Sequence, residues 1–183
     1  IPEVVSKLSE FIYDITDPIH YNSAYAFLYL YLFLLNKDTP ACTFTIRSTL
    51  PIGAGLGSSA SMAVCLSGAL SILGNHIVPP TLQYDDFSIN NSVDSSFIDS
   101  WSFMAEKCIH GNPSGIDNTV ACHGGAIMFQ RMKSSIPSVK TLIKNFPTLK
   151  LLLTNTSHPR KTSDLVSNVA SLTNQFPLIS GSI

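Results

Sequence analysis

The chain of 183 residues has the length of one domain or slightly more, and 45% of its residues are hydrophobic while 13% are charged. This composition indicates a globular protein with a substantial core and excludes an intrinsically disordered segment. The formal net charge of -1 provides no basic field for nucleic acid or an anionic membrane surface. We therefore expect neither nucleic acid nor a membrane as a partner.

The four cysteines, Cys42, Cys65, Cys108 and Cys122, are widely spaced and form no CxxC pair. Their small or apolar neighbours favour buried free thiols over disulfides, which indicates a reducing compartment and a cytoplasmic protein. We find no signal-peptide pattern, and the apolar stretch at 24–35 is too short to cross a bilayer. Because the chain begins at Ile1 without a methionine, we expect it to be a fragment.

The N-terminal half of the sequence predicts helices on either side of a strand and a glycine loop. Residues 3–14 and 21–36 have helical patterns, and the second is apolar almost all round, so we expect it to be buried. β-branched and aromatic residues alternate in "CTFTIRSTL" at 42–50, as in a strand. The glycine loop at 51–57 then leads into a helix predicted from Ser58 to Leu73.

The C-terminal half predicts a surface excursion, two helices that meet at a corner, and further strands. Residues 74–100 are rich in Pro, Asn, Ser and Asp and carry no sustained period, so we expect a surface excursion that ends in a short helix. The next helix, at 101–111, ends at Gly111, and Asn112 and Pro113 suit the N-cap and first position of another. The remaining predicted elements are strands at 124–132 and 149–156 and a helix from near Thr162.

The glycine loop suits an anion. Gly53, Gly55 and Gly57 permit positive φ, and the first turn of the next helix adds unpaired N–H groups and the positive end of its dipole. Phosphate is the natural ligand, although the same pattern also occurs where a strand and a helix pack closely. No lysine follows the last glycine, which excludes a Walker A motif, and the continuation GSSA excludes a dinucleotide fingerprint. The paired hydroxyls favour a serine that reaches the magnesium ion of a nucleotide.

Two motifs together resemble a known family. "PIGAGLGSSAS" at 51–61 and "HGNPSGIDNTV" at 110–120 resemble the GHMP kinases, specifically the mevalonate kinases of fungal type. The segments "IRSTLP", "WSFMAEKCIHG" and "LLLTNTSHPRKTSDLV" extend the resemblance over most of the chain outside 74–98 and 131–147. The family's N-terminal lysine motif and its C-terminal glycine-rich motif lie outside these 183 residues, so we expect this fragment to be inactive alone.

The resemblance implies an α/β fold, an α+β two-layer sandwich. Its ribosomal-protein-S5-like N-terminal domain would occupy 1–148, and the start of the C-terminal domain 149–183. It also implies Mg²⁺-dependent phosphorylation of (R)-mevalonate by ATP to 5-phosphomevalonate in isoprenoid and sterol biosynthesis, a homodimer, and feedback inhibition by prenyl diphosphates. Two different functions stay open beside it: a non-catalytic protein of this fold that senses substrate and nucleotide, and a sister kinase for another small alcohol or phosphomonoester.

The resemblance further implies roles for individual residues. Asp117 would be the catalytic aspartate beside the substrate hydroxyl, and Ser59 and Glu106 would be magnesium ligands. The residues implied to contact substrate are Ser114, Arg160 and Thr162. Those implied to contact ATP are Ser48, Gly53, Ala54, Gly55, Leu56, Gly57, Ser58 and Ser59.

The residue types are also compatible with purely structural roles. Asp117 suits the positive end of a helix dipole, and Glu106 would otherwise form a surface ion pair with Lys107 or Arg131. We interpret His110 as a structural residue. Helix capping would equally explain Ser114 and Thr162, and Ser48 also suits an ordinary strand position.

Overall fold

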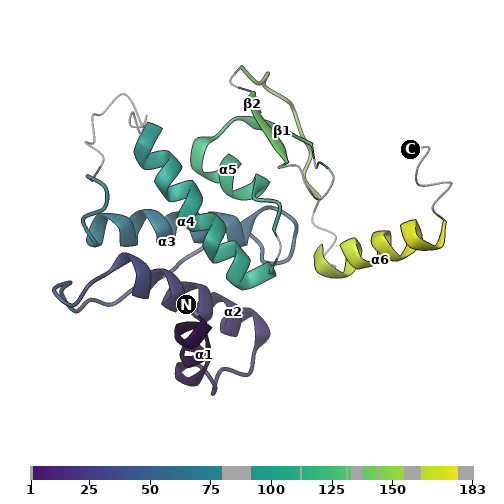
Figure 1. The fold of residues 1–183 in the computed structure, drawn as a ribbon. Helices are drawn as coiled ribbons and strands as arrows, with labels where there is room; N and C mark the ends of the chain where they lie inside the picture. Colours follow the sequence, from purple (N-terminus) through teal and green to yellow (C-terminus); the bar gives the residue numbers. More distant parts are fainter. Residues whose placement is uncertain are drawn as a thin grey trace.

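The computed structural model describes residues 2–79, 92–111, 113–130, 132, 138–143, 145–154 and 162–176. In this part of the chain the elements are α1 (Pro2–Phe11), α2 (Pro18–Leu34), α3 (Ser58–Leu73), α4 (Ser92–His110), α5 (Ile116–His123), β1 (Ala126–Gln130), β2 (Val139–Ile143) and α6 (Thr162–Gln175). Figure 1 shows α1 to α5 gathered together, the two strands beside α5, and α6 lying apart from the other helices.

The core lies where α2, α3 and α4 pack together. Its buried residues are Ala26, Leu30, Leu34, Ala63, Leu66, Leu70 and Ala105. Trp101, Cys108 and Ile109 of α4 pack against this cluster, as their helical spacing predicts. Full burial of one leucine contributes about 1.5–3 kcal/mol, so this core fixes α3 relative to α4.

Small residues let α3 lie close to its neighbours. The predicted helix from Ser58 to Leu73 is confirmed as α3. Ala63 and Ser67 are fully buried, and a Cβ added at Gly68 would lie 3.7 Å from Cδ1 of Ile98 on α4. The contact between the two helices therefore depends on small side chains along α3.

Helix α2 is buried on one side only, so the prediction of burial all round is wrong. Asp17 caps its start by accepting a hydrogen bond from the His20 N–H at 2.8 Å. Leu30 is fully buried, whereas Leu32 is 49% exposed. The described elements that contact α2 are α1, α3 and α4, and they leave the Leu32 face uncovered. No helix in the described part of the chain is long and apolar enough to span a membrane.

Two of the predicted strands are wrong. Residues 41–49 and 146–154 form no strand, and residues 155–156 of the second prediction lie outside the described residues. A strand needs a neighbour to receive its backbone hydrogen bonds, and in the described residues only β1 and β2 pair. The first segment is held by side chains instead, since the Phe44 ring lies 5.1 Å from the Phe27 ring between centroids.

The predicted strand at 124–132 is confirmed by β1. It pairs antiparallel with β2, in a register from Ala126 opposite Ile143 to Gln130 opposite Val139. The sequence did not predict β2, which lies in a polar region rich in serine and lysine. All five of its residues are exposed, so no buried face imposes an alternating pattern on them.

The corner between α4 and α5 differs from the prediction at both ends. Helix α4 begins at Ser92, so the expected short helix and the helix at 101–111 are one element, which ends before Gly111 as predicted. Helix α5 begins at Ile116, and its N-cap is Gly115 with φ of 71°, so the N-cap predicted at Asn112 is wrong. Asn112 itself lies outside the described residues. The left-handed conformation at Gly115 changes the direction of the chain, and α5 begins at the next residue, Ile116.

The four cysteines are free, as predicted, but the predicted burial is wrong for two of them. Cys42 and Cys65 are exposed, because one lies in the extended segment and the other on an outer face of α3. Burial raises the pKa of the Cys108 thiol to about 11, and burial together with the nearby Asp99 charge raises the pKa of Cys122 to about 11.

Candidate functional site

The glycine loop before α3 has the geometry that the sequence predicts. Gly53, Gly55 and Gly57 have φ of 74°, 73° and 70°. At Gly55 nothing lies within 4 Å of an added Cβ, so the positive φ alone requires glycine there. Gly57 is the N-cap of α3 and no side chain caps this helix, so the N–H groups of its first turn are available to an anion.

Ser59 lies in this first turn and meets two side chains of α4. Its Oγ is 3.3 Å from Nε2 of His110. The same Nε2 is 3.6 Å from Oε2 of Glu106, one helical turn earlier on α4. The Ser59 hydroxyl also favours the charged form of the Glu106 carboxylate and so opposes the rise of its pKa. Residues as far as 51 positions apart in the sequence thus form one polar cluster, which we call the Ser59 cluster: Ser59, Glu106 and His110.

Glu106 is buried with an unsatisfied oxygen. Its exposed fraction is 4%, and Oε1 has no hydrogen-bond partner. Burial raises the pKa of the Glu106 carboxyl; His110 and the Ser59 hydrogen bond oppose the increase, and Asp117 adds to it. The alternative of a surface ion pair between Glu106 and Lys107 is wrong. The Lys107 Nζ lies instead 4.8 Å from the centroid of the Phe103 ring. Arg131 lies outside the described residues.

Asp117 approaches the same place from a third helix. It is exposed, it lies in the first turn of α5, and its charge acts on Glu106. A Cβ added at Gly57 would lie 4.0 Å from Cβ of Asp117, so α5 begins close to the end of the glycine loop. The starts of α3 and α5 and the last turns of α4 therefore converge on one site. The position of Asp117 in the first turn of α5 is equally compatible with a helix-dipole role.

The start of α5 is held by hydrogen bonds from several elements. Ser114 Oγ accepts a hydrogen bond from the Ile116 N–H at 3.3 Å, which forms a local turn just before the helix, since the N-cap is Gly115. Lys140 of β2 donates from Nζ to the Gly115 carbonyl oxygen at 3.0 Å. Thr119 donates to Oδ2 of Asp99 on α4 at 3.1 Å. These contacts fix α5, and with it Asp117, against α4.

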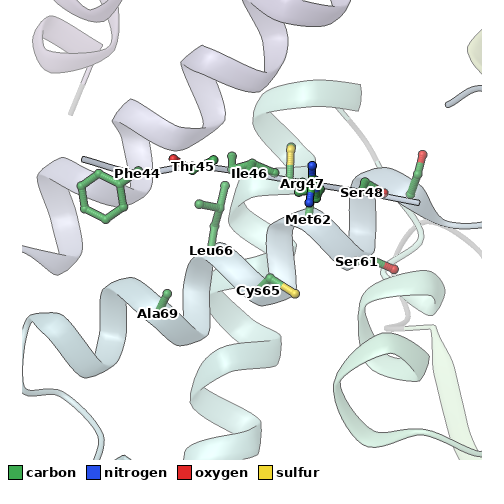
Figure 2. A pocket seen from close by; sticks show the side chains of 11 residues that line it. Phe44, Thr45, Ile46, Arg47, Ser48, Ser61, Met62, Cys65, Leu66 and Ala69 are labelled. Carbon is green, nitrogen blue, oxygen red and sulfur yellow. The ribbon is translucent and has the colours of Figure 1, made fainter. Parts of the chain in front are cut away.

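A pocket of about 310 Å³ lies between the extended segment and the outer face of α3. Figure 2 shows residues 44–48 crossing over this face, with Ser48 at the end nearest the start of the helix. Ser48 Oγ accepts a hydrogen bond from the Leu50 N–H at 3.1 Å. Ser58 and Ser61 line the pocket too, so it adjoins the first turn of α3.

The Ser59 cluster fits a cation of the magnesium type in its oxygen donors. Mg²⁺ is bound through one or two carboxylates, with waters and phosphate oxygens in the remaining positions. The unpartnered Glu106 oxygen and the Ser59 hydroxyl provide oxygen donors of this kind. In the described residues, no three His, Cys, Asp or Glu side chains form a metal-binding group, so a cation here needs the serine or a bound substrate as well.

The structure brings Ser59 and Glu106, the predicted magnesium ligands, together with His110. The helix beginning predicted near Thr162 is confirmed by α6, whereas the side chain of Thr162 and the whole of Arg160 lie outside what the structure describes. Ala54 and Leu56 lie in the glycine loop, and Leu56 is 43% exposed. From the sequence we interpret His110 as a structural residue, and its spacing of four residues from Glu106 places both on one face of a helix.

A convergence of an uncapped glycine-loop helix, a serine and two carboxylates defines the class of this protein. The chain belongs to the GHMP kinases, because the model of the GHMP kinases N terminal domain matches residues 22–125, which contain the glycine loop, the Ser59 cluster and Asp117. The predicted family is therefore confirmed, and with it the α/β fold class.

Within that class, three proteins similar to this chain are all named mevalonate kinase. The chain is 50% identical to the mevalonate kinase of Candida albicans over 185 residues, which is 100% of this chain and 43% of that protein. It is 45% identical to the mevalonate kinase of Aspergillus fumigatus, over 90% of this chain and 30% of that protein. For the mevalonate kinase of Bos taurus the identity is 40%, over 97% of this chain and 43% of that protein. The chain thus spans less than half the length of these relatives.

Proposed function

We propose that this chain is part of an ATP-dependent kinase that phosphorylates mevalonate to 5-phosphomevalonate. The observation that carries the proposal is the convergence of the glycine loop, Ser59, Glu106 and Asp117 where α3, α4 and α5 meet. Phosphoryl transfer to an alcohol needs these parts: a phosphate cradle, a cation site and a group beside the attacking hydroxyl. The substrate is proposed from relatives that are named mevalonate kinase.

The glycine loop and the first turn of α3 would bind the nucleotide phosphates. Their N–H groups lie at the uncapped start of the helix, where the dipole favours negative charge. We also assign Ser48, Ala54, Leu56 and Ser58, which lie in or beside the loop, to contact with the nucleotide. Three glycines at positive φ allow this loop conformation without the strain that other residues would have.

Ser59 and Glu106 would hold Mg²⁺ beside these phosphates. The ion supplies charge neutralisation at the transferring phosphoryl group. Glu106 is suited to this role because its buried carboxylate has an oxygen without a partner. Ser59 is suited because its hydroxyl lies in the first turn of α3, between the phosphate cradle and α4.

Asp117 would accept a hydrogen bond from the mevalonate hydroxyl and orient it toward the phosphate. The aspartate is exposed, so a substrate can reach it, and it lies beside the end of the glycine loop. Lys140 and Thr119 hold the start of α5 and so keep this carboxylate in place. We further assign Ser114, Arg160 and Thr162 to substrate binding.

The wider setting forms part of the same proposal. We place the enzyme in isoprenoid and sterol biosynthesis in the cytoplasm, as a homodimer that prenyl diphosphates inhibit. We divide the chain into an N-terminal domain at 1–148 and the start of a second domain at 149–183. The test is a coupled assay of ADP release by the full-length protein with mevalonate, phosphomevalonate and galactose. Turnover with mevalonate alone supports the proposal, and turnover with only phosphomevalonate or only galactose contradicts it.

The substitution Asp117→Asn tests the central residue. It keeps the side-chain shape and removes the charge, so nucleotide binding should persist while single-turnover phosphorylation of mevalonate falls by about 10² to 10⁴-fold. The matched control is Asp94→Asn, which removes the same charge from the first turn of another helix, α4. Asp94 lies twelve residues before Glu106, or about 18 Å along the helix. Phosphorylation by Asp117→Asn at the rate of the control would leave Asp117 only its helix-dipole role.

A further inference from the structure

His110 occupies a place that the proposed magnesium chemistry does not use. Its Nε2 lies 3.3 Å from Ser59 Oγ and 3.6 Å from Glu106 Oε2, the two side chains assigned to the cation. Glu106 and His110 are four residues apart on α4, so their side chains project from the same face of one helix. The imidazole is about half exposed, which leaves it room to turn toward an arriving ion.

The distances within the Ser59 cluster suit donors around one metal ion. Metal–donor bonds of about 2.1 Å place neighbouring donors about 3.0–3.4 Å apart in octahedral or tetrahedral geometry. The two measured separations, 3.3 Å and 3.6 Å, are within a few tenths of an ångström of that range. Nε2 of His110 therefore lies at about the distance expected between two donors of one ion, both from Ser59 Oγ and from Glu106 Oε2.

A second observation points to a cation at the same place. Glu106 is buried to 4% exposure, and its Oε1 has no hydrogen-bond partner. An ionised carboxylate in such a position costs several kcal/mol unless it is paired or coordinated. The imidazole contact involves Oε2, so the carboxylate keeps one buried oxygen without a partner, and its negative charge favours a nearby cation.

We propose that Ser59, Glu106 and His110 together form a three-donor site for a divalent transition metal, with Nε2 of His110 as a direct ligand. The inference rests on the proposed function only in placing the cation at Ser59 and Glu106. Imidazole is a good ligand for Mn²⁺, Co²⁺ and Zn²⁺ and a poor one for Mg²⁺, which prefers oxygen. The cluster therefore selects among cations: Mg²⁺ uses its two oxygen donors, and a transition metal uses all three. Coordination uses the tautomer whose proton is on Nδ1.

The experiment uses Mn²⁺ alone, without nucleotide, on the full-length protein. Electron spin-echo envelope modulation of the bound Mn²⁺ should show a directly coordinated nitrogen in the wild type. In His110→Gln this signal should disappear, and the Mn²⁺ dissociation constant should rise by about tenfold or more. Mg²⁺ affinity, measured by competition, should change by about twofold or less, because oxygen donors remain. His20→Gln is the matched control, since His20 also lies beside a carboxylate, Asp17, at 3.2 Å on an exposed surface.

Three results would overturn the inference: no Mn²⁺ bound to the wild type, bound Mn²⁺ without a coordinated nitrogen, or a nitrogen signal that is lost in His20→Gln and kept in His110→Gln. Labelling the wild type with ¹⁵N-imidazole histidine shows whether the coordinated nitrogen belongs to a histidine, and a second variant, His110→Asn, tests His110 itself when His110→Gln does not fold. The ADP-release assay with Mg²⁺ and mevalonate is scored separately. Failure of the metal site and failure of the proposed kinase activity are therefore distinguishable.

Discussion

The helices α2 and α3 bury leucine side chains, whereas the segments at 41–49 and 146–154 form no helix or strand, and leucines of the second segment are exposed. Leu30 and Leu70 on the helices are fully buried, whereas Leu151, Leu152 and Leu153 are 74%, 92% and 72% exposed. A helix satisfies its backbone hydrogen bonds internally, so it only needs a neighbour for one face. An extended segment needs neighbours for its backbone as well as for its side chains. The site is therefore built on helix ends, where local sequence fixes the backbone.

The sharpest way to break this comparison is to truncate one leucine in each region. Leu30→Ala in the full-length protein should lower the free energy of unfolding by about 2–5 kcal/mol, because it leaves a cavity between α2, α3 and α4. Leu152→Ala should change it by no more than about 0.5 kcal/mol, because the side chain is 92% exposed. Denaturant unfolding of both variants measures the difference. An equal loss in both would mean that Leu152 is covered by another part of the protein, and the contrast between the regions would fail.

How much of the fold the sequence could predict follows from the same contrast. The bounds of α3 were predictable because a glycine loop and a C-terminal glycine delimit a helix locally. The strand predicted at 42–50 was wrong although its residues alternate, since pairing depends on a partner that no local pattern reveals. β2 was missed for the converse reason, because all its residues are exposed and its partner β1 supplies the pairing.

Cysteine reactivity sharpens the comparison at the level of single side chains. Burial raises the pKa of Cys108 on α4 from the ordinary 9.0 to about 11, so its thiolate fraction near pH 8 should fall about 100-fold on folding. Alkylation of Cys108, followed by peptide mass spectrometry, should be slower in the native than in the denatured protein by about that factor or more. Cys42 in the extended segment is exposed and should react at similar rates in both states.

The pH dependence of this effect has a definite sign. Because the folded state raises the pKa of Cys108, it favours the neutral thiol, and the associated stability is fully present below about pH 9. That contribution is lost as the pH rises from about 9 toward 11. Equal native and denatured reaction rates for Cys108 at about pH 8 would show that the core packed against α4 does not shield this thiol.

The site was more predictable than its internal geometry. The sequence predicted Ser59, Glu106 and Asp117 as site residues, and the structure brings the three together at the starts of α3 and α5 and the last turns of α4. The mostly apolar neighbours of Glu106 indicated that its carboxylate needs a partner, although a glutamate beside Lys107 is also compatible with a surface ion pair. The sequence indicated a structural role for His110 but did not predict its contact with Ser59, which depends on how α3 packs on α4. Tertiary contacts of this kind leave little trace in a single sequence.

The smallest expected effect separates backbone strain from crowding at two glycines beside the site. Gly111 and Gly115 have nearly the same φ, 75° and 71°, but differ in surroundings. A Cβ at Gly111 meets nothing within 4 Å, so Gly111→Ala should cost only the left-handed strain of about 1–2 kcal/mol. A Cβ at Gly115 would lie 2.8 Å from Cδ2 of Phe103 and 2.7 Å from Nζ of Lys140. Gly115→Ala should therefore cost about 1–3 kcal/mol more.

The two glycine variants also have different consequences for the site. Nζ of Lys140 lies 5.6 Å from the centroid of the Phe103 ring and donates to the Gly115 carbonyl, so an alanine methyl group must displace one of them or the start of α5. Displacing α5 moves Asp117, and phosphorylation by Gly115→Ala should fall while Gly111→Ala keeps its rate. Thermal unfolding and single-turnover phosphorylation of the pair measure both effects. Equal destabilisation of the two variants would show that Phe103 and Lys140 yield freely, and that the start of α5 is not held against its neighbours.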